Sequence, residues 1–463
     1  MFYMGQGVRS PLPCGLVRLP LADRLLYAFG SLGNATLFWT LGAWLIYFYA
    51  PPEGRGLPIL VPLGIVALTR GVGQVLEALD DPIIGWWSDR TRGRWGRRIP
   101  FLLIGTPVLA VSFWLLWTPP VTAGPLLVAV YFFIVLELFY FANTIVGAPY
   151  EALQAEIATT SDDRVSLGVW KVFFGTLGLV LAVVVSPQLI ERLGFAGMGL
   201  VLAAIAGVSL YVMLFGLWRR GTLRRTVPVD EARVGLRDSI RISLSHRPFI
   251  ALAMSFVLFS VGYNMLIGLM PYYVTVIHGA SEGDVTLYLA GVIAAVLVAL
   301  PVMGRVASRV GKRAVYAACM LAIGLYLVFL GVGAFRPLLP GIAFDAQARS
   351  LIWLSGLGFA ALFVFPGAMM ADVIDDDAAR SGHRRAAAYY GMFKTLEKFA
   401  QGAAAVLFGV LLQTFGYTPD RSLGIQLALP AAGVCALAGF AMLVTGYHLR
   451  GAGGHVRAEG GAT

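Results

Sequence analysis

Acidic side chains inside an apolar stretch are the residues of this sequence best suited to chemistry. Glu77 and Asp81 are four residues apart, in a run of otherwise apolar residues long enough to cross a bilayer. On a helix this spacing places both carboxylates on one face, with Asp80 one position away. An ionisable residue at the centre of a membrane helix costs at least about 2.5–3.5 kcal/mol, so it normally faces a wet cavity or a partner. We expect Glu77, Asp80 and Asp81 to bind a small cation.

The composition indicates that these carboxylates lie in a membrane protein. Of 463 residues, 58% are hydrophobic and 13% are charged, whereas soluble domains carry about 25% charged residues. Apolar segments of about 20 residues, the length that spans a bilayer, recur along the whole chain. Since no stretch remains for a soluble catalytic domain, we expect neither an enzyme nor a bound cofactor.

The apolar segments predict an all-α membrane protein with twelve transmembrane helices in two six-helix halves. The first six are expected near residues 25–50, 58–87, 99–117, 126–148, 167–190 and 199–217. The last six are expected near residues 249–277, 286–304, 314–334, 351–370, 386–415 and 423–449. This divides the chain into an N-terminal bundle (1–217), a cytoplasmic linker (218–247) and a C-terminal bundle with a short tail (248–463).

Positive charge in alternate loops predicts the orientation. The net charge is +10, but the arginines cluster in short loops between apolar segments, which indicates membrane topology rather than nucleic-acid binding. Loops rich in Lys and Arg normally face the cytoplasm. We therefore expect a protein of the cell membrane with both termini on the cytoplasmic side.

A weak internal repeat relates the two halves. Residues 85–90 (GWWSDR) and 304–309 (GRVASR) follow the second helix of each half, which is typical of transporters built from repeats.

Three motifs resemble one transporter family. Residues 81–100 (DPIIGWWSDRTRGRWGRRIP) resemble the signature of the glycoside-pentoside-hexuronide:cation symporters, the melibiose-permease-like branch of the major facilitator superfamily. Residues 149–156 (PYEALQAE) and 371–375 (ADVID) with 381–385 (SGHRR) are similar to further motifs of that family, in the same order. The resemblance implies the major facilitator fold and a symporter of a sugar or related polar solute.

The resemblance also assigns roles to individual residues. The family's two cation-binding acids fall on Glu77 and Asp81, which implies coupling to Na⁺ or H⁺, and its helix-eleven lysine falls on Lys398. Lys394 and Glu397 lie near Lys398 and are expected to face the interior rather than lipid. Lys171 matches a basic sugar-contacting position, although it could equally extend to the membrane surface.

Charged loop residues resemble the family's cytoplasmic gate, in which the loops of the two halves interlock. An alternative is that these charges only set the topology. The expected gate residues are Asp89, Arg90, Arg97, Arg98, Asp372 and Asp375.

Two departures from the family pattern bear on the substrate. The acids that hold sugar hydroxyls in sugar-transporting members are replaced here by Ala35 and Gly147. Asn34 and Asn143 lie beside these positions and could hold another polar group. Glu137 could line the outer cavity or make a structural hydrogen bond.

Other functions remain open at this point. A lysophospholipid-like amphiphile is an alternative substrate, because the two sugar-binding acids are missing. A non-transporting sensor or a membrane enzyme is a further alternative, although no added signalling domain or catalytic set is evident. We expect a small-molecule solute and the lipid bilayer as partners, with no nucleic acid and no obligate protein partner.

Overall fold

The computed structural model describes residues 19–53, 56–91, 97–158, 161–224, 241, 244–333, 335–336, 340, 343–381 and 386–448. Across these residues the fold is helical, and its one β feature is an isolated bridge between Thr418 and Arg421. The first half contains α1 (Leu21–Tyr49), α2 (Leu63–Arg90), α3 (Ile99–Leu116), α4 (Pro125–Ile157), α5 (Ser161–Val180) and α6 (Ser186–Arg219). The second contains α8 (Arg247–Tyr272), α9 (Val285–Val310), α10 (Lys312–Gly333), α11 (Phe344–Ser381), α12 (Ala386–Phe415) and α13 (Leu423–Gly446).

Four short helical segments adjoin the long helices. They are the π-helical η1 (Leu181–Val185) and η3 (Tyr273–Ile277), and the 3₁₀ segments η2 (Thr222–Arg224) and η4 (Glu282–Asp284). The chain turns between its fifth and sixth long helices at Gly194, whose φ of 69° interrupts α6. A glycine takes this conformation without the steric cost that a side chain would add. Residues 186–193 therefore continue α5 and η1, which agrees with the break expected between 190 and 199.

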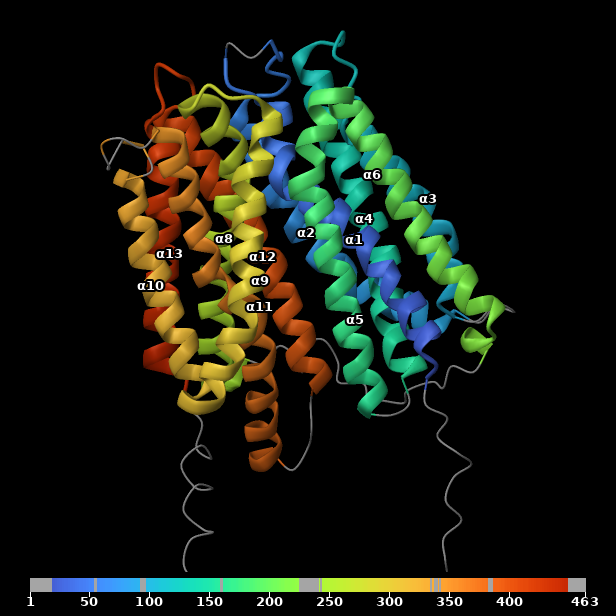
Figure 1. Ribbon diagram of the computed structural model, residues 1–463. Helices are drawn as coiled ribbons and strands as arrows, with labels where there is room; N and C mark the ends of the chain where they lie inside the picture. The colour runs from blue at the N-terminus through green and yellow to red at the C-terminus, as the bar shows by residue number, and fades with distance from the viewer. Residues whose placement is uncertain are drawn as a thin grey trace, which may run out of the picture.

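The long helices form two bundles that lie side by side (Figure 1). In the first, α1 packs against α5 and α6, and α3 packs against α4 and α6. In the second, α13 packs against α8 and α10, and α11 packs against α9 and α10. The closest packing between the bundles is that of α2 on α12, with a smaller contact between α1 and α8. The exact domain limits stay a prediction, because residues 225–240 lie outside the described residues.

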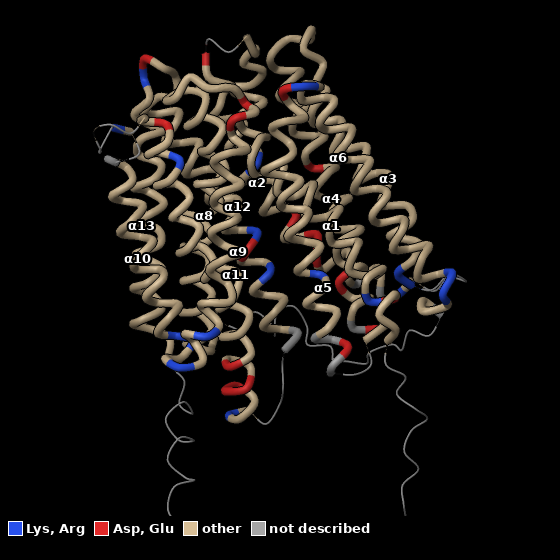
Figure 2. The backbone as a smooth tube through the Cα atoms, viewed as in Figure 1, with Lys and Arg blue, Asp and Glu red and all other residues tan. Residues whose placement is uncertain are grey.

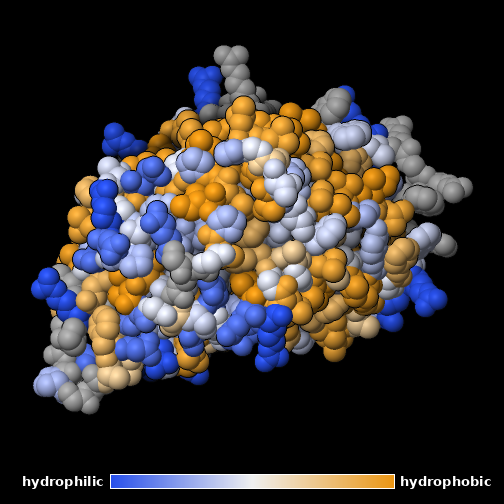
Figure 3. Space-filling view, turned by 90° about the horizontal axis from the view of Figure 1, so that it is seen from above, coloured by the Kyte–Doolittle hydropathy of each residue, from blue (hydrophilic) through white to orange (hydrophobic). Residues whose placement is uncertain are grey.

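The outer surface of the bundles is suited to lipid. Apolar side chains such as Leu126, Val172 and Ile104 are 67–79% exposed on the helices, where acyl chains rather than water would cover them. Hydrophobic residues also cover much of the end seen from above, among hydrophilic ones (Figure 3). Charged residues lie mostly at the two ends of the helices, with a smaller group at mid-height between the bundles (Figure 2). The prediction of an all-α membrane protein is confirmed.

The number of membrane crossings stays a prediction. Within the described ranges, nine segments are long and apolar enough to span a membrane, and one of them, residues 166–219, includes both α5 and α6. The more polar helices α1 and α2 are not among the nine.

Hydrogen bonds join the two halves at one end of the molecule. The Tyr47 hydroxyl donates to Glu282 at 2.8 Å, and the Tyr272 hydroxyl donates to the carbonyl of Ala50 at 2.7 Å. The Gln188 amide donates to the carbonyl of Gly283 at 2.9 Å. These contacts lie at the end formed by the loops after α1 and η3. We call it the bound end; the halves lean apart toward the opposite end (Figure 1).

Candidate functional site

The predicted acids of α2 meet Lys398 of α12 where the two halves touch. The Lys398 ammonium lies 3.3 Å from Glu77 Oε1 and 2.8 Å from Asp81 Oδ2. It also lies 3.4 Å from the Glu77 carbonyl oxygen. Asn143 of α4 donates to Glu77 Oε1 at 2.8 Å. The structure therefore brings together Glu77, Asp81, Lys398 and Asn143, with Glu77 buried and Asp81 and Lys398 partly exposed.

Small residues allow α2 and α12 to approach closely enough for this pairing. A Cβ atom added to Gly71 would lie 2.5 Å from a methyl carbon of Val406, and one added to Gly409 would lie 2.1 Å from the Ala67 Cβ. Gly402 would meet the Gly71 carbonyl oxygen at 3.1 Å. Close approach at small residues is a common way for membrane helices to pack. It places the Lys398 side chain directly between the two carboxylates.

The other predicted site residues lie around this centre without joining it. Asp80 is partly exposed and lies near Lys398, but the ion pair of Lys398 is with Asp81. Lys394 pairs with Glu397 one turn along α12 at 2.7 Å. Glu137 of α4 lies against Gly73 of α2, and its Oε1 is buried without a hydrogen-bond partner among the described residues.

Two further predicted substrate residues belong to the N-terminal half. Asn34 of α1 is partly buried, and its Oδ1 has no hydrogen-bond partner in the described part of the chain. Lys171 of α5 forms an ion pair with Glu151 of α4, and its ammonium lies 3.3 Å from Gln154 Oε1. A Cβ added to Gly147 would meet nothing within 4 Å, so there is open space at the position where the family resemblance predicts a sugar-binding acid.

Three of the predicted gate residues make ion pairs within their own halves. Arg97 Nη2 lies 2.8 Å from Glu156 Oε1 and Arg98 Nε lies 3.0 Å from it, so both arginines share one buried carboxylate of α4. In the other half, Asp372 of α11 pairs with Lys312 of α10 at 2.7 Å. A gate that interlocks across the halves therefore stays a prediction, for a state other than this one.

The remaining gate residues are only located by the structure. Arg90 is the exposed last residue of α2, and Asp375 is exposed on α11. Asp89 lies on α2, and its side chain lies outside the described part of the structure.

Sequence reasoning missed Arg70 and Gln74, which share the inner face of α2 with Glu77 and Asp81, the acids predicted to bind the cation. Residues 70, 74, 77 and 81 follow the spacing i, i+4, i+7, i+11, which marks one helix face. That spacing, together with the rarity of Arg inside a membrane helix, could have identified Arg70. Its guanidinium lies in a small pocket between the halves that also contains Asn264 of α8 and Gln401 of α12.

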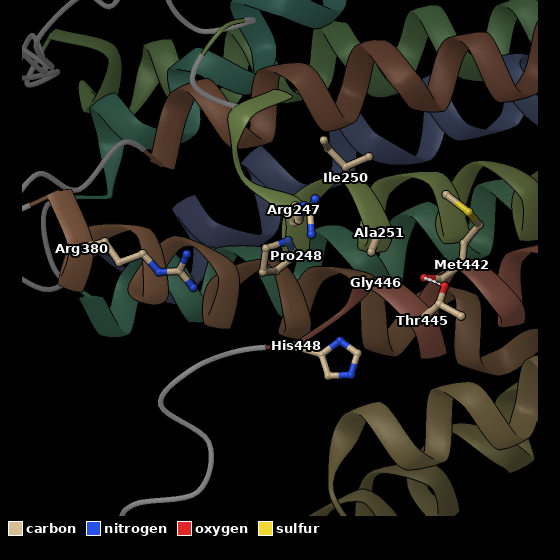
Figure 4. A pocket seen from close by; sticks show the side chains of 9 residues that line it. All are labelled: Arg247, Pro248, Ile250, Ala251, Arg380, Met442, Thr445, Gly446 and His448. Atoms are coloured by element: carbon tan, nitrogen blue, oxygen red, sulfur yellow. Dashed lines mark hydrogen bonds between the residues drawn. The ribbon is translucent and has the colours of Figure 1, made fainter.

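A larger cavity lies away from the contact between α2 and α12. It has a volume of about 460 Å³ and lies between the start of α8 and the ends of α11 and α13 (Figure 4). Its charged or polar lining residues include Arg247, Arg380 and His448, and Arg380 is paired with Asp376 at 2.6 Å. None of the predicted cation or substrate residues lines this cavity.

Comparison with known proteins places the chain among transporters. The family described as "MFS/sugar transport protein" matches residues 26–448. An uncharacterized symporter of Synechocystis sp. is 25% identical over 88% of this chain and 89% of its own length. The isoprimeverose transporter of Lactiplantibacillus pentosus is 21% identical over 88% and 83%. The sodium-dependent lysophosphatidylcholine symporter 1-A of Danio rerio is 23% identical over 79% and 75%.

Solved structures show the same fold at low sequence identity. The nucleoside transporter NupG aligns with a TM-score of 0.63 at 16% identity, over 91% of this chain and 98% of that one. A bacterial homologue of the iron transporter ferroportin, in an inward-facing state, aligns with a TM-score of 0.65 at 13% identity, over 92% and 99%. The predicted fold and family resemblance are confirmed: this chain belongs to the MFS/sugar transport family of the major facilitator superfamily, a family of membrane transporters and not of enzymes.

Proposed function

We propose that this protein is a symporter that moves a sugar, glycoside or related polar solute together with Na⁺ or H⁺ by alternating access. The observation that carries the proposal is the pairing of Lys398 with both Glu77 and Asp81. Two carboxylates and one ammonium at membrane depth form a site whose charge changes when a cation arrives. Since α2 and α12 belong to different halves, that change acts on a contact between the halves.

The cation and Lys398 compete for the same oxygens. Carboxylate oxygens are ligands for hard cations such as Na⁺, and either acid can instead take a proton. A cation bound between Glu77 and Asp81 neutralises one of the two negative charges that hold the Lys398 ammonium and so weakens its ion pairs. The hydrogen bond from Asn143 holds the Glu77 carboxylate in place while the cation replaces the ammonium. The released Lys398 is then free to contact the solute.

The solute would bind after the cation, between the two halves. Asn34, Glu137 and Lys171 of the N-terminal half, with Lys394 and Glu397 of α12, are the proposed contributors to binding and coupling; Asp80 is a third possible cation ligand. Solute binding then allows the halves to rock and expose the site to the opposite side. The gate residues would lock across the halves when the present open end closes.

The charge pattern supports placing the protein in the cell membrane with both termini in the cytoplasm. In this orientation the bound end faces outward and the separated end faces the cytoplasm. A bilayer-impermeant thiol reagent tests the orientation in whole cells. Glu53→Cys at the bound end should react from outside, and Ser308→Cys at the other end should not.

The cation site is tested by stability of the purified protein. We expect Na⁺ or a change of pH to shift its thermal unfolding, and Asp81→Asn to abolish the shift by removing one of the two charges. Asp420→Asn, in an exposed loop, is the matched control and should respond as the wild type does. Solute uptake by reconstituted protein that is independent of any cation gradient would refute the coupling.

A second candidate substrate is a lysophospholipid-like amphiphile. It is favoured by the relationship to sodium-dependent lysophosphatidylcholine symporters and by Ala35 and Gly147 in place of two acids. Competition separates the two: inhibition of uptake by lysophosphatidylcholine but not by sugars would favour the amphiphile, and the reverse result would favour the sugar.

A further inference from the structure

The cavity of about 460 Å³ between α8, α11 and α13 lies at the end of the molecule opposite the bound end (Figure 4). Its volume falls in the range of small-ligand pockets, about 300–1,000 Å³. The first residues of α8 and the last residues of α11 and α13 line it. Because helix ends lie where lipid head groups meet water, the cavity is placed to meet a head group rather than the transported solute.

Three basic side chains line this cavity, one at the end of each helix. Arg247 begins α8, Arg380 lies next to the last residue of α11, and His448 follows α13. Arg380 pairs with Asp376 at 2.6 Å, whereas Arg247 and His448 have no ion pair within the described ranges. Figure 4 shows the Arg380 side chain extending from α11 toward the start of α8. Since no acidic residue is among the described residues that line the cavity, its walls favour an anion.

The backbone at the start of α8 adds to this positive charge. His246 precedes the helix but its side chain makes no hydrogen bond to the first turn, and its Nε2 lies 3.0 Å from Asp376 Oδ2 instead. The first-turn N–H groups therefore lack a side-chain cap, and the positive end of the helix dipole favours an anion beside them. The negative end of α13 is compensated by Arg313, whose Nη2 donates to the Val444 carbonyl at 2.9 Å. Side chains and backbone thus favour an anion at the same place.

The cavity wall becomes apolar toward the membrane. Met442 of α13 lies one turn before Gly446 and is 37% exposed, and Ile250 of α8 lies about one turn after Arg247 and is partly buried. Exposed apolar side chains on the outside of a membrane protein are covered by acyl chains. A cavity that is basic at the helix ends and apolar one turn further in matches a phospholipid. A free phosphate would use only the basic part.

We propose that this cavity binds a phosphate group through Arg247 and Arg380, with His448 beside them, and that an anionic membrane lipid carries the phosphate. A guanidinium presents parallel N–H donors that match two phosphate oxygens. Basic pockets between membrane helices are suited to such head groups. The acyl chains of the lipid would then begin along Met442 and Ile250. The site shares no residue with the proposed cation and solute sites, so it does not depend on the symport proposed above.

A lipid bound in this cavity would connect three helices of the second half. Its phosphate lies where the start of α8 meets the ends of α11 and α13, and none of these three helices belongs to the first half. A ligand that binds only the folded protein raises the stability of that protein. The lipid should therefore stabilise the second half and remain with the protein during purification.

Titration of the purified full-length protein in detergent tests the proposal. Dioleoylphosphatidylglycerol, dioleoylphosphatidylcholine and inorganic phosphate are added separately, at one ionic strength. Native mass spectrometry counts the bound lipids, and thermal unfolding reports stabilisation. We expect phosphatidylglycerol to be retained more strongly than phosphatidylcholine and to raise the melting temperature further, because the choline group cancels the negative charge of the phosphate. Inorganic phosphate alone should have little effect, since it lacks the acyl chains.

Variants then show whether the cavity carries this preference. Arg247→Gln and Arg380→Gln should each weaken phosphatidylglycerol binding about fivefold, as for one basic residue at an anionic membrane surface. The double variant should lose more than either single one. Arg309→Gln is the matched control, because Arg309 is exposed at the same end of the molecule, on α9, and does not line the cavity. If loss of the Asp376 pair makes Arg380→Gln unstable, Arg247→Gln still decides.

Three results would count against the proposal. Equal retention of both lipids with no response to inorganic phosphate would overturn it outright. An equal loss of binding in Arg309→Gln and in the cavity variants would also overturn it, because any positive charge at this end would then suffice. A response to inorganic phosphate that the cavity variants lose, without preference for phosphatidylglycerol, would keep the phosphate site and overturn its lipid source. The thermal shift with the coupling cation should be unchanged in Arg247→Gln, so the two sites are judged separately.

Discussion

The two ends of this transporter are held together in different ways. At the bound end, single hydrogen bonds such as Tyr47 to Glu282 and Tyr272 to Ala50 pass from one half to the other. At the opposite end, ion pairs such as Glu156 with Arg98 and Asp372 with Lys312 join helices of the same half. The charged contacts thus make each half a unit, and the weaker contacts between units can be exchanged. This is the arrangement that rigid-body rocking needs.

Lys398 differs from both groups, because its ion pairs cross between the halves. The change Lys398→Ala should have the largest effect of the variants considered. It removes the ion pairs between α12 and the acids Glu77 and Asp81 of α2. Cation-coupled uptake should therefore fall to background. The thermal shift with the coupling cation should persist or increase, because the cation no longer competes with an ammonium. Uptake and unfolding are measured on one preparation, with Arg349→Ala as control. Retention of more than half of the coupled uptake would contradict the role of Lys398.

A second pair of variants compares an ion pair within one half, at Glu156, with a hydrogen bond between the halves, at Glu282. Glu156→Gln should lower stability by about 3 kcal/mol, because it leaves two arginines around a buried position without their carboxylate. Glu282→Gln at the bound end should cost less than about 1.5 kcal/mol, the range for one hydrogen bond. Denaturant unfolding in detergent measures both. Equal losses would remove the distinction between the two ends.

A third change acts on the equilibrium between conformations rather than on stability. Tyr47→Phe removes a bond between halves and should increase the population open at the bound end about two- to tenfold. Spin labels at Glu53→Cys and Asp420→Cys, with Cys14, Cys319 and Cys435 replaced, report the distance between halves. Tyr49→Phe is the matched control, because the Tyr49 hydroxyl bonds to Leu116 within one half. A similar distance change in both variants would refute the assignment.

The smallest expected effect is a pH dependence at the bound end. His278 follows η3 and lies 3.8 Å from Asp345; burial lowers the pKa of His278, although Asp345 acts in the opposite direction. The unfolded chain takes up this proton near pH 6.5 and the folded chain at lower pH, so stability should fall as the pH falls through that range. His278→Gln should reduce the slope of melting temperature between pH 7.5 and 5.5. His448→Gln, which is exposed, should not reduce it.

Local patterns in the sequence predicted much of the fold and the centre of the site. Helix positions follow from apolar segments, and the shared face of Glu77 and Asp81 follows from their spacing. Lys398 was assigned by family resemblance, and the structure brings it to both acids. The helix positions, the shared face of the two acids and the role of Lys398 can each be inferred from nearby residues in the chain or from a family motif.

Features that depend on packing between distant helices were not predictable. Arg97 and Arg98 contact Glu156, 58 residues or more along the chain, rather than a residue of the other half. The pocket at Arg70 requires α1, α2, α8 and α12 to meet, and nothing in a single segment indicates which helices will do so. The close approach at Gly71 and Gly402 likewise depends on which faces are paired.

The glycine contact between α2 and α12 also has a mechanical consequence. Surfaces of backbone and methyl groups lack interlocking side chains, so this contact can serve as a fulcrum. Lys398 lies one turn from Gly402, about 6 Å along the axis, whereas the start of α12 at Ala386 lies about 24 Å from it. If α12 tilts as a rigid rod, a movement of about 1 Å at Lys398 becomes about 4 Å at the helix start. In the proposed cycle, leverage of this kind would convert the exchange of the Lys398 ammonium for a cation into a larger movement at the start of α12.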